Sequence, residues 1–293
     1  MSFNGLFSIG LSGINAFATG LEAVSNNIAN SQTTGFRRIQ TEFSDLVTQN
    51  APQLNEAVGT GVAGTGVSAV NRQLITEQGA ITRTNNPTDV AISGEGFFVV
   101  SETPDGNPTT SPFLFTRAGS FRPDAAGNLV NEAGYFLRGA VAGADGTAPT
   151  IGGINSLETV NINRLPPLAN GEAPLGDLTG VEIDADGRVV GSFANGQTRT
   201  LFEIPVATFV NADGLEDAAD TAFRQTANAG ELTLSRSNQG RAGTIEGSAL
   251  EISTVDIGQE FSTLIATQRA YSSNARVISL ADELWRTLSE TAA

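Results

Sequence analysis

Hydrophobic residues near both ends of the chain recur at helical intervals. Near the C-terminus the steps are 3, 7, 7 and 7, for Phe261, Leu264, Tyr271, Ile278 and Trp285. Near the N-terminus they are 7, 3, 4, 3 and 4, for Phe7, Ile14, Phe17, Leu21, Val24 and Ile28. Such spacing places apolar side chains on one face of an amphipathic helix, as in a coiled-coil seam. The sequence predicts two terminal helices, paired as a coiled-coil-like core domain.

The ends of these helices are marked by residues that start or stop helices. The N-terminal helix is expected over about residues 7 to 29, because the small polar residues and glycine of 31–35 follow it. The C-terminal helix is expected over about residues 253 to 287, since Ser253 and Asp256 resemble a capping box. At 1.5 Å per residue, that helix would be roughly 50 Å long.

The middle of the chain has a different pattern, in which short apolar or alternating runs are separated by turn residues. The strand-like runs are residues 90–92, 97–100, 113–117, 181–183 and 201–209. Two turns between such runs contain Asp186-Gly187 and Asn195-Gly196, dipeptides that favour type I′ hairpins. This pattern predicts a mostly antiparallel β domain that resembles a sandwich or barrel.

These elements predict an α+β fold with a fixed order along the chain. Residues 1–35 contain the N-terminal helix, 36–83 an extended linker, 84–250 the β domain and 251–293 the C-terminal helix. Within the β domain, residues 140–179 carry four prolines and indicate a surface excursion with one short strand at 159–162.

Composition excludes several function classes. The chain has 293 residues, a formal net charge of −15 and no lysine, for which we have no physical account. Phosphate binding needs clustered basic residues, so a nucleic-acid partner is not expected. Cysteine and histidine are absent, which removes thiolate nucleophiles, imidazole bases and the usual zinc sites. Neither a classical signal peptide nor an apolar run of membrane-spanning length is recognised, so direct membrane insertion is not expected.

No catalytic, cofactor-binding or metal-binding residues are predicted. Asp184 and Asp186 resemble the start of a calcium loop, but the glycine and glutamate that should follow are misplaced, so a plain turn is favoured. Paired carboxylates of a secreted hydrolase could be sought at turns and strand ends, at Glu95, Asp105, Asp124, Glu182, Asp184 and Asp186. Solvated surface charge explains these residues more simply. A hydrolase and an adhesin remain as alternatives to a structural protein.

The C-terminal helix is too long for its apolar stripe to be buried by a thin β domain. The stripe therefore needs the N-terminal helix and neighbouring subunits, and polar residues within it would fix the register between packed helices. The candidate subunit-interface residues are Ile14, Phe17, Leu21, Val24, Ile28, Phe261, Leu264, Gln268, Arg269, Tyr271, Asn274, Ile278 and Trp285.

Several stretches resemble bacterial flagellar rod and hook proteins. In the N-terminal part they are LSGIN at residues 11–15, SNNIAN at 25–30 and TTGF at 33–36. The others, in chain order, are QG at 78–79, DVAI at 89–92, GEGFF at 94–98, FTRAGSF at 115–121, ALE at 249–251, VD at 255–256, QRAY at 268–271 and NA at 274–275. The resemblance covers nearly the whole chain in the right order.

The resemblance implies a homopolymeric tube, in which terminal helices line a central export channel and β domains form the outer layer. It implies export by the flagellar type III apparatus without a cleaved signal, and a final location in the extracellular flagellum. The implied partners are neighbouring rod proteins, hook–filament junction proteins, the hook cap and the export machinery, with no cofactor.

Within this family two members are considered. The opening Met1-Ser-Phe-Asn4 and the stretch 180–191 are most similar to the hook protein, a flexible joint that transmits torque from the motor to the filament. Hook proteins usually carry a further outer β domain after the position of Gly139, where this chain has only 40 residues before Gly180. That shorter plan is nearer the distal rod protein, a rigid drive shaft, which is the alternative.

Overall fold

The computed structural model describes residues 3–47, 64–104, 112–143, 149, 151–164, 176–219 and 221–291. The chain divides into two compact units. The helical unit comprises residues 1–31, 38–74 and 255–293, and the β unit comprises residues 32–37 and 75–254. The described residues form an α+β fold with two long helices and a large, mostly antiparallel sheet.

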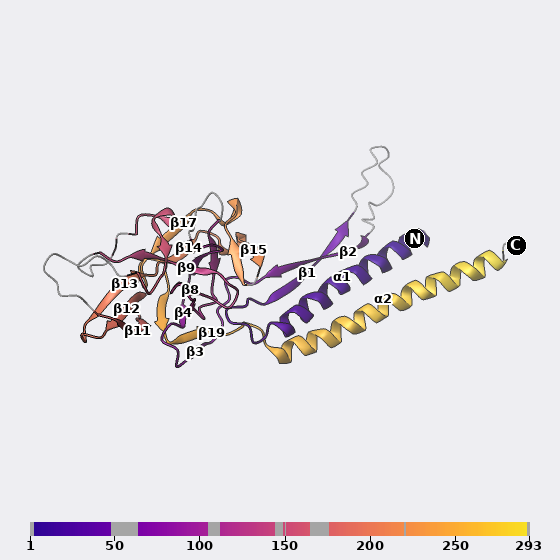
Figure 1. Cartoon of the computed structure of the whole chain (residues 1–293). Coiled ribbons are helices and arrows are strands. Elements are labelled where there is room, and N and C mark those ends of the chain that lie inside the picture. The colour runs from indigo at the N-terminus through magenta and orange to yellow at the C-terminus, as the bar shows by residue number, and fades with distance from the viewer. Residues whose placement is uncertain are drawn as a thin grey trace, which may run out of the picture. The chain divides into compact units, whose positions relative to one another are not determined.

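The helical unit contains helices α1 (Phe3–Ala29) and α2 (Ile257–Thr291) and strands β1 (Ile39–Val47) and β2 (Gly64–Gln73). The two strands pair antiparallel, with Ile39 opposite Gln73 and Leu46 opposite Gly66, and lie beside α1 in Figure 1. The sequence predicts an extended linker over residues 36–83, whereas β1 and β2 within it pair as a hairpin. The apolar residues of β1, which are Ile39, Phe43, Leu46 and Val47, do not alternate regularly with polar ones, so its sequence carries a weak strand signal.

The cap of α2 differs from the predicted one. Asp256, rather than Ser253, caps the helix, because its Oδ1 accepts hydrogen bonds from the backbone N–H groups of Gly258 and Gln259 at 2.8 and 3.1 Å. The stop of α1 is confirmed. Gly35 adopts a φ of 70°, and a Cβ there would lie 2.6 Å from the backbone nitrogen of Ala118.

The main sheet of the β unit has thirteen strands, and its longest path runs β11-β12-β13-β9-β5-β6-β16-β15. Its strands are β5 (Phe97–Ser101), β6 (Leu114–Thr116), β7 (Arg122–Pro123), β8 (Leu129–Val130), β9 (Phe136–Val141), β10 (Glu158–Thr159), β11 (Leu178–Ile183), β12 (Arg188–Phe193), β13 (Thr198–Glu203), β14 (Val206–Phe209), β15 (Glu216–Ala219), β16 (Ala222–Arg224) and β17 (Leu232–Ser235).

Two small sheets complete the unit. Strand β18 (Thr244–Gly247) pairs with β4 (Val90–Ser93), and β19 (Ala249–Glu251) pairs with β3 (Ile81–Arg83). Short 3₁₀ turns lie at Ile154–Ser156, Ala212–Gly214 and Ala227–Ala229. The predicted excursion over 140–179 contributes β10, and parts of it lie outside the described residues.

Both predicted hairpin turns are present, but their type is not I′. Gly187 and Gly196 have φ values of 79° and 81°, whereas the residues before them do not have positive φ. A type I′ turn requires positive φ at both central residues. Asp184 explains the first turn, because its Oδ1 accepts hydrogen bonds from the backbone N–H groups of Asp186 and Arg188 at 3.0 and 2.8 Å.

Two hydrophobic clusters form the core of the β unit. One surrounds Phe98, Phe121 and Phe202, and the other surrounds Phe115 and Phe223. The Phe98 and Phe121 rings meet edge to face at 5.9 Å, a favourable aromatic geometry. In the described part of the chain, no helix is long and apolar enough to cross a membrane.

Candidate assembly interface

Glycines let helix α1 approach helix α2 closely. A Cβ at Gly10 would lie 2.8 Å from the Ile278 side chain, and one at Gly13 would lie 2.9 Å from that of Asn274. Farther along α1, a Cβ at Gly20 would lie 3.4 Å from Thr267. The partner numbers fall along α2 as those of α1 rise, so the helices run antiparallel. Side chains of α2 therefore fill space that α1 leaves empty.

The α2 residues that face inward recur at steps of three and four. The buried ones are Glu260, Thr267 and Ala281, and the half-buried ones between them at this spacing are Leu264, Ala270, Asn274 and Ile278, with Thr263 and Ala275 beside them. This period of about 3.5 residues keeps one side of a helix against its partner. Leu264 and Ile278 are the large apolar residues in this set, and the other apolar ones are alanines, so the inward face alone does not account for the large hydrophobic residues of α2.

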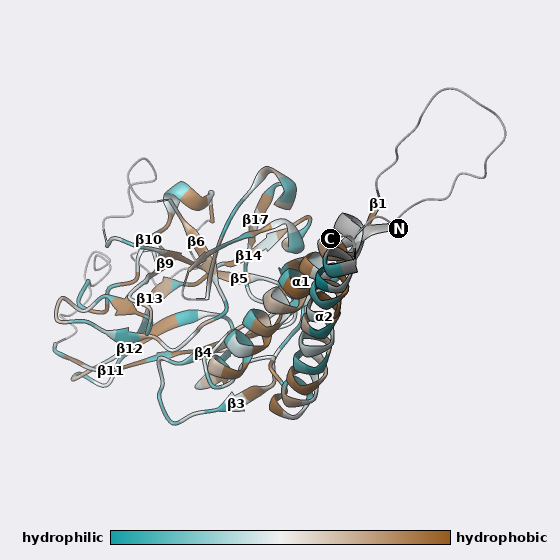
Figure 2. Ribbon diagram, turned by 90° about the vertical axis from the view of Figure 1, so that its right-hand side faces the viewer, coloured by the Kyte–Doolittle hydropathy of each residue, from teal (hydrophilic) through white to brown (hydrophobic). Residues whose placement is uncertain are grey.

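Large apolar side chains of α2 also lie in solvent. Phe261, Ile265, Leu280, Leu284 and Trp285 are each about half exposed, with fractions of 50 to 58%. Ile257, Tyr271 and Val277 are exposed as well. Figure 2 shows brown and teal alternating along α2, as expected for a helix that presents apolar residues on more than one side. Contiguous exposed apolar residues mark surfaces that bind other molecules.

The predicted N-terminal interface residues lie at intermediate depth. Val24 is buried, whereas Ile14, Phe17, Leu21 and Ile28 are partly buried. The Phe17 ring lies 5.4 Å from that of Phe43 in β1. The predicted apolar stripe therefore exists, but the hairpin β1–β2 accounts for part of its covering. Sequence periodicity could not reveal this hairpin as a packing partner.

The predicted C-terminal interface residues divide between two sides of α2. Leu264, Asn274 and Ile278 are partly buried, and the last two contact α1. Phe261, Tyr271 and Trp285 are exposed, as are Gln268 and Arg269. Gln268 and Arg269 border a shallow depression together with Ile265, Ser272, Ser273 and Arg276. The structure thus separates the predicted residues that contact α1 from those whose side chains are exposed.

Polar contacts attach the hairpin to α1. The side-chain amide of Asn27, which is fully buried, accepts from the Ile39 N–H and donates to the Ile39 carbonyl, both at 2.8 Å. Asn27 thereby pairs with the backbone donor and acceptor of the first residue of β1, as a neighbouring strand would. At the other end of the hairpin, the Ser12 hydroxyl accepts a hydrogen bond from the Val67 N–H at 3.2 Å.

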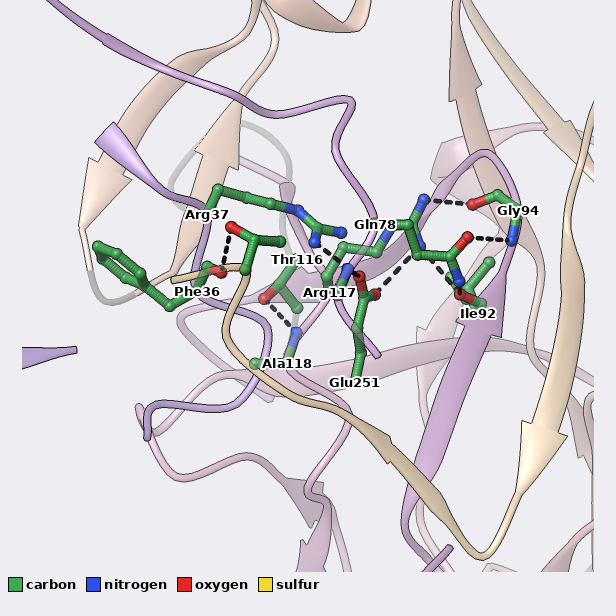
Figure 3. A network of polar contacts seen from close by, with 11 residues as sticks. Phe36, Arg37, Gln78, Ile92, Gly94, Thr116, Arg117, Ala118 and Glu251 are labelled. Atoms are coloured by element: carbon green, nitrogen blue, oxygen red, sulfur yellow. Dashed lines mark hydrogen bonds and ion pairs between the residues drawn. The ribbon is translucent and has the colours of Figure 1, made fainter. Parts of the chain in front are cut away.

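A buried ionic network lies in the β unit, centred on the carboxylate of Glu251 (Figure 3). Its Oε1 accepts hydrogen bonds from Arg37 Nη1 at 2.6 Å and from the Gly79 N–H at 2.7 Å. Its Oε2 accepts one from Arg117 Nη1 at 3.2 Å. Both ends of this carboxylate are therefore paired, which is the condition for a tolerable buried charge.

Arg117, which donates to the second carboxylate oxygen, makes further hydrogen bonds. Arg117 Nη1 also donates to the Ile92 carbonyl at 3.0 Å, and Nη2 donates to the Gly94 carbonyl at 2.6 Å. The Gln78 side chain bonds the same backbone, donating to Ile92 and accepting from Gly94. Burial lowers the pKa of Arg117 to about 10, although the Glu251 carboxylate acts to raise it. The guanidinium still carries its charge at neutral pH.

This network explains stretches that the sequence analysis used only as resemblance. Gln78-Gly79, Gly94, Arg117 and Glu251 belong to four separate motifs, and Arg37 directly follows a fifth. Folding brings all of them to one carboxylate. The sequence does not predict this cluster, because its members are far apart along the chain. A usable signal was present in two of the motifs, FTRAGSF and ALE, where Arg117 and Glu251 stand close to apolar residues.

The acidic residues considered for catalysis serve ordinary roles. Asp184 and Asp124 each accept backbone N–H groups within a turn, and the Asn128 side chain is the main cause that lowers the pKa of Asp124. Glu95 pairs with Arg241 at 3.0 Å in solvent. Asp105 lies outside the described residues. These contacts agree with turn and surface positions.

Comparison with protein-family models gives three matches in chain order. Residues 7–37 match the "Flagella basal body rod protein" model, and residues 91–191 match the "Flagellar hook protein FlgE/F/G D1 domain". Residues 246–291 match the "Flagellar basal body rod FlgEFG protein C-terminal" model. Among similar proteins, the basal-body rod protein FlgG of Bacillus subtilis is 31% identical, with 95% of this chain and 96% of that protein covered. The chain belongs to the flagellar hook and basal-body rod protein family.

Other members of this family are equally similar. The FlgG rod protein of Caulobacter vibrioides is 33% identical, with 95% of this chain and 96% of that protein covered. The hook protein FlgE of Brucella abortus is 29% identical, with 97% of this chain and 98% of that protein covered. The family consists of structural proteins of the flagellum and not of enzymes, so the hydrolase alternative is wrong.

Proposed function

We propose that this chain is a subunit of the flagellar hook and that it assembles with copies of itself into a flexible tube. The exposed apolar side chains of α2 carry this proposal. Phe261, Ile265, Leu280, Leu284 and Trp285 would be covered by terminal helices of neighbouring copies. Burial of apolar surface at roughly 25 cal/mol per Å² would stabilise the polymer relative to the monomer.

In this proposal α1 and α2 form a coiled-coil-like core that lines an export channel. The inward face of α2 pairs the helices within a subunit, and its outward face joins subunits. Gln268 and Arg269 lie on the outward side, where polar contacts would fix the register between neighbouring helices. Ile14, Phe17, Leu21 and Ile28 of α1 would complete their burial in the same contacts.

Two neighbouring arginines support a division of labour between the units. Arg37 is ion-paired in the β unit with Glu251, and Arg38 is ion-paired in the helical unit with Glu260 at 2.6 Å. At this boundary between residues 37 and 38, each unit thus holds its own arginine with an ion pair. The helical core would hold subunits along the tube, while weaker contacts between β units would let protofilaments change length during rotation.

The proposed location is the extracellular flagellum, reached through the type III export machinery without a cleaved signal. The proposed partners are the adjoining rod proteins, the hook–filament junction proteins and the hook cap. No nucleic acid, cofactor or membrane-inserted segment enters the proposal.

The distal rod is the second candidate, because of the length of this chain. The alignment with FlgG of Bacillus subtilis extends over 289 residues, close to the 293 of this chain. The alignment with the Brucella abortus hook protein extends over 401 positions, so it contains long gaps on the side of this chain. Because this chain lacks those positions, its length is closer to that of the rod protein.

Removal of residues 255–293 tests the assembly proposal. We expect the truncated chain to keep a folded β unit, measured by the β signal in circular dichroism, and to form no tubes in electron microscopy. Tubes formed by the truncated chain would contradict the proposal. Electron microscopy of the full chain also separates the two candidates, because a curved polymer indicates a hook and a straight one indicates a rod.

A further inference from the structure

Two exposed arginines of α2 have no acidic partner. Three arginines of the helical unit, Arg38, Arg72 and Arg286, are ion-paired within that unit. Arg269 and Arg276 are exposed and form no ion pair with any described residue. Both border the shallow depression on α2, which has a volume of about 430 Å³ and is also lined by Ile265, Gln268, Ser272 and Ser273. The depression therefore offers two guanidinium groups to an anionic group from outside the subunit.

Helix α1 carries a single charged residue, and it is acidic. The side chain of this residue, Glu22, is exposed and forms no ion pair with any described residue. The exposed positions in line with it on α1 are spaced by three, four and seven residues, and most of them hold small or polar side chains. They are Ser8, Leu11, Asn15, Glu22, Ser25 and Ala29. A helix that packs on this side of α1 would therefore meet one charge only, the Glu22 carboxylate.

Within one subunit, Glu22 and the two arginines lie on opposite outer sides of the helix pair. Gly20 of α1 faces Thr267 of α2, and Glu22 follows Gly20 by two positions. Arg269 follows Thr267 by two positions, and Arg276 lies seven positions farther along α2. At 3.6 residues per turn, two positions correspond to a rotation of about 200° and seven positions to about two turns. Each of the three charges therefore lies on the side of its helix that faces away from the contact between α1 and α2.

This arrangement decides which kind of contact the charges can make. They are kept apart inside one subunit, but they meet when two subunits lie side by side in the same orientation. Because α1 and α2 are antiparallel, Glu22 is level with about residue 265 of α2, roughly 6 Å along the axis from Arg269. A contact that joins different surfaces of two copies leaves one of each surface free, so it repeats from copy to copy and builds a ring or a helical assembly.

We propose that the depression on α2 binds the Glu22 carboxylate of a second copy of this chain, between Arg269 and Arg276. The inference rests on the proposed self-assembly and names one of its contacts. Charge complementarity selects the occupant, because a carboxylate accepts charge-assisted hydrogen bonds from guanidinium groups. The two arginines are about 10 Å apart along the helix, so their long side chains can converge on one carboxylate.

Removal of the Glu22 charge tests this contact. We expect Glu22→Gln to raise the critical concentration for assembly roughly two- to fivefold, as for the loss of an exposed ion pair. A general charge effect has the opposite sign, because one negative charge fewer on a chain of net charge −15 favours association. The matched control is Asp45→Asn, at an exposed and unpaired acidic residue of β1, which should not raise the critical concentration. Thermal unfolding of each monomer should be unchanged, since both positions are exposed.

Charge reversal on both sides gives the sharper test. The double variant Arg269→Glu, Arg276→Glu should assemble less well than Glu22→Gln, because it repels the incoming carboxylate. Adding Glu22→Arg to the double variant should restore assembly. Adding Asp45→Arg instead gives the same net charge and should not restore it. Equal restoration by the two additions would overturn the inference, as would equal critical concentrations for Glu22→Gln and Asp45→Asn.

Cross-linking between copies locates the contact directly. The chain has no cysteine, so mixed Ser25→Cys and Ser272→Cys chains can be joined between positions 25 and 272 only across two copies. Both serines are exposed and neighbour the proposed contact, whose charges remain. A short bismaleimide added to the mixed polymer should give this link in mass spectrometry. Ala125→Cys, at an exposed turn of the β unit, should give no link to position 272.

The outcomes separate this inference from the proposed function. A polymer that gives no link between positions 25 and 272 overturns the inference and leaves the assembly proposal standing. If the unchanged chain forms no polymer at any concentration, the proposed function fails and the inference fails with it.

Discussion

The helical unit leaves many large apolar side chains exposed, whereas the β unit buries most of its own. Among the described residues, all exposed large apolar side chains except Val210 and Ile252 belong to the helical unit. Within the described part of this unit, the buried apolar residues are only Ala16, Ala23, Val24 and Ala281. The β unit instead buries its phenylalanines in two clusters. One unit is complete as a monomer, and the other needs partners.

The two units also differ in how they use glycine and charge. In the helical unit, glycines of α1 make room for α2, which brings the helices together without a large apolar core. In the β unit, the buried Glu251 carboxylate accepts hydrogen bonds from Arg37, Gly79 and Arg117, so it joins four parts of the sequence. A helix that packs through small residues can pack in the same way against a helix of another subunit. A buried ion network, in contrast, requires one arrangement of its charged residues. The difference suits a stable domain attached to an assembling one.

The strongest way to test this comparison is to remove the charge at the centre of the network. Glu251→Ala removes the carboxylate that the buried Arg37 and Arg117 share, which should lower the free energy of unfolding of the β unit by about 3 to 5 kcal/mol. Calorimetry of the monomer measures this loss. Glu95→Ala, which removes a solvent-exposed ion pair, should cost less than about 1 kcal/mol. Equal losses would show that the network is not structurally central.

Truncation of one phenylalanine in each unit separates folding from assembly. Phe98→Ala should lower the free energy of unfolding by about 3 to 5 kcal/mol, because its ring is fully buried. Phe261→Ala should change monomer stability by less than about 0.5 kcal/mol, since its ring is half exposed. It should nevertheless raise the critical concentration for assembly. A destabilised monomer with unchanged assembly would contradict the assignment of Phe261 to a subunit interface.

A methyl group at Gly13 tests the helix seam. Gly13→Ala would place a Cβ 2.9 Å from the Asn274 side chain, and the overlap should cost about 1 to 3 kcal/mol, offset in part by better helix propensity. Helix content and critical concentration both measure the loss. Combining it with Asn274→Ala should restore pairing because the second change removes the clashing atoms. If the double variant does not regain helix content and assembly, the effect of Gly13→Ala does not arise from its contact with Asn274.

The smallest expected effect concerns pH and the β unit. Burial raises the pKa of Glu203, although Arg236 acts in the opposite direction. A raised folded-state pKa stabilises the fold below the unfolded pKa, and that contribution is lost as pH rises through the folded value. The stability of Glu203→Gln should therefore depend less on pH between pH 4 and 7 than that of the unchanged chain. The expected difference is below about 1 kcal/mol, and parallel pH profiles in denaturant unfolding would contradict it.

Part of the fold was predictable because the signals are local. The periodicity of Phe261 to Trp285 predicts a helix without knowledge of its partner. Gly187 and Gly196 predict hairpins, although not their turn type, which depends on the Asp184 carboxylate. The hairpin β1–β2 was missed because its pairing joins residues far apart in the sequence across the interval 48–63.

The candidate site was predictable only as a pattern of apolar residues. The sequence placed Leu264, Tyr271 and Ile278 on one stripe, but it could not show that Ile278 contacts Gly10 while Phe261 remains in solvent. That division depends on the crossing of α1 and α2, and a helical period of 3.5 residues allows more than one inward face. Which arginines of the helical unit form ion pairs was likewise not predictable, because two of the pairs join residues from distant parts of the sequence.

The sequence by itself determined that a β domain lies between two terminal helices, the amphipathic character of those helices and membership of the flagellar axial family, since periodicity, turns and motifs are local properties. Only the tertiary structure decided which apolar residues remain exposed and that Arg37, Arg117 and Glu251 meet. The physical reason is that burial and ion pairing depend on distances between residues that the chain brings together only when it folds.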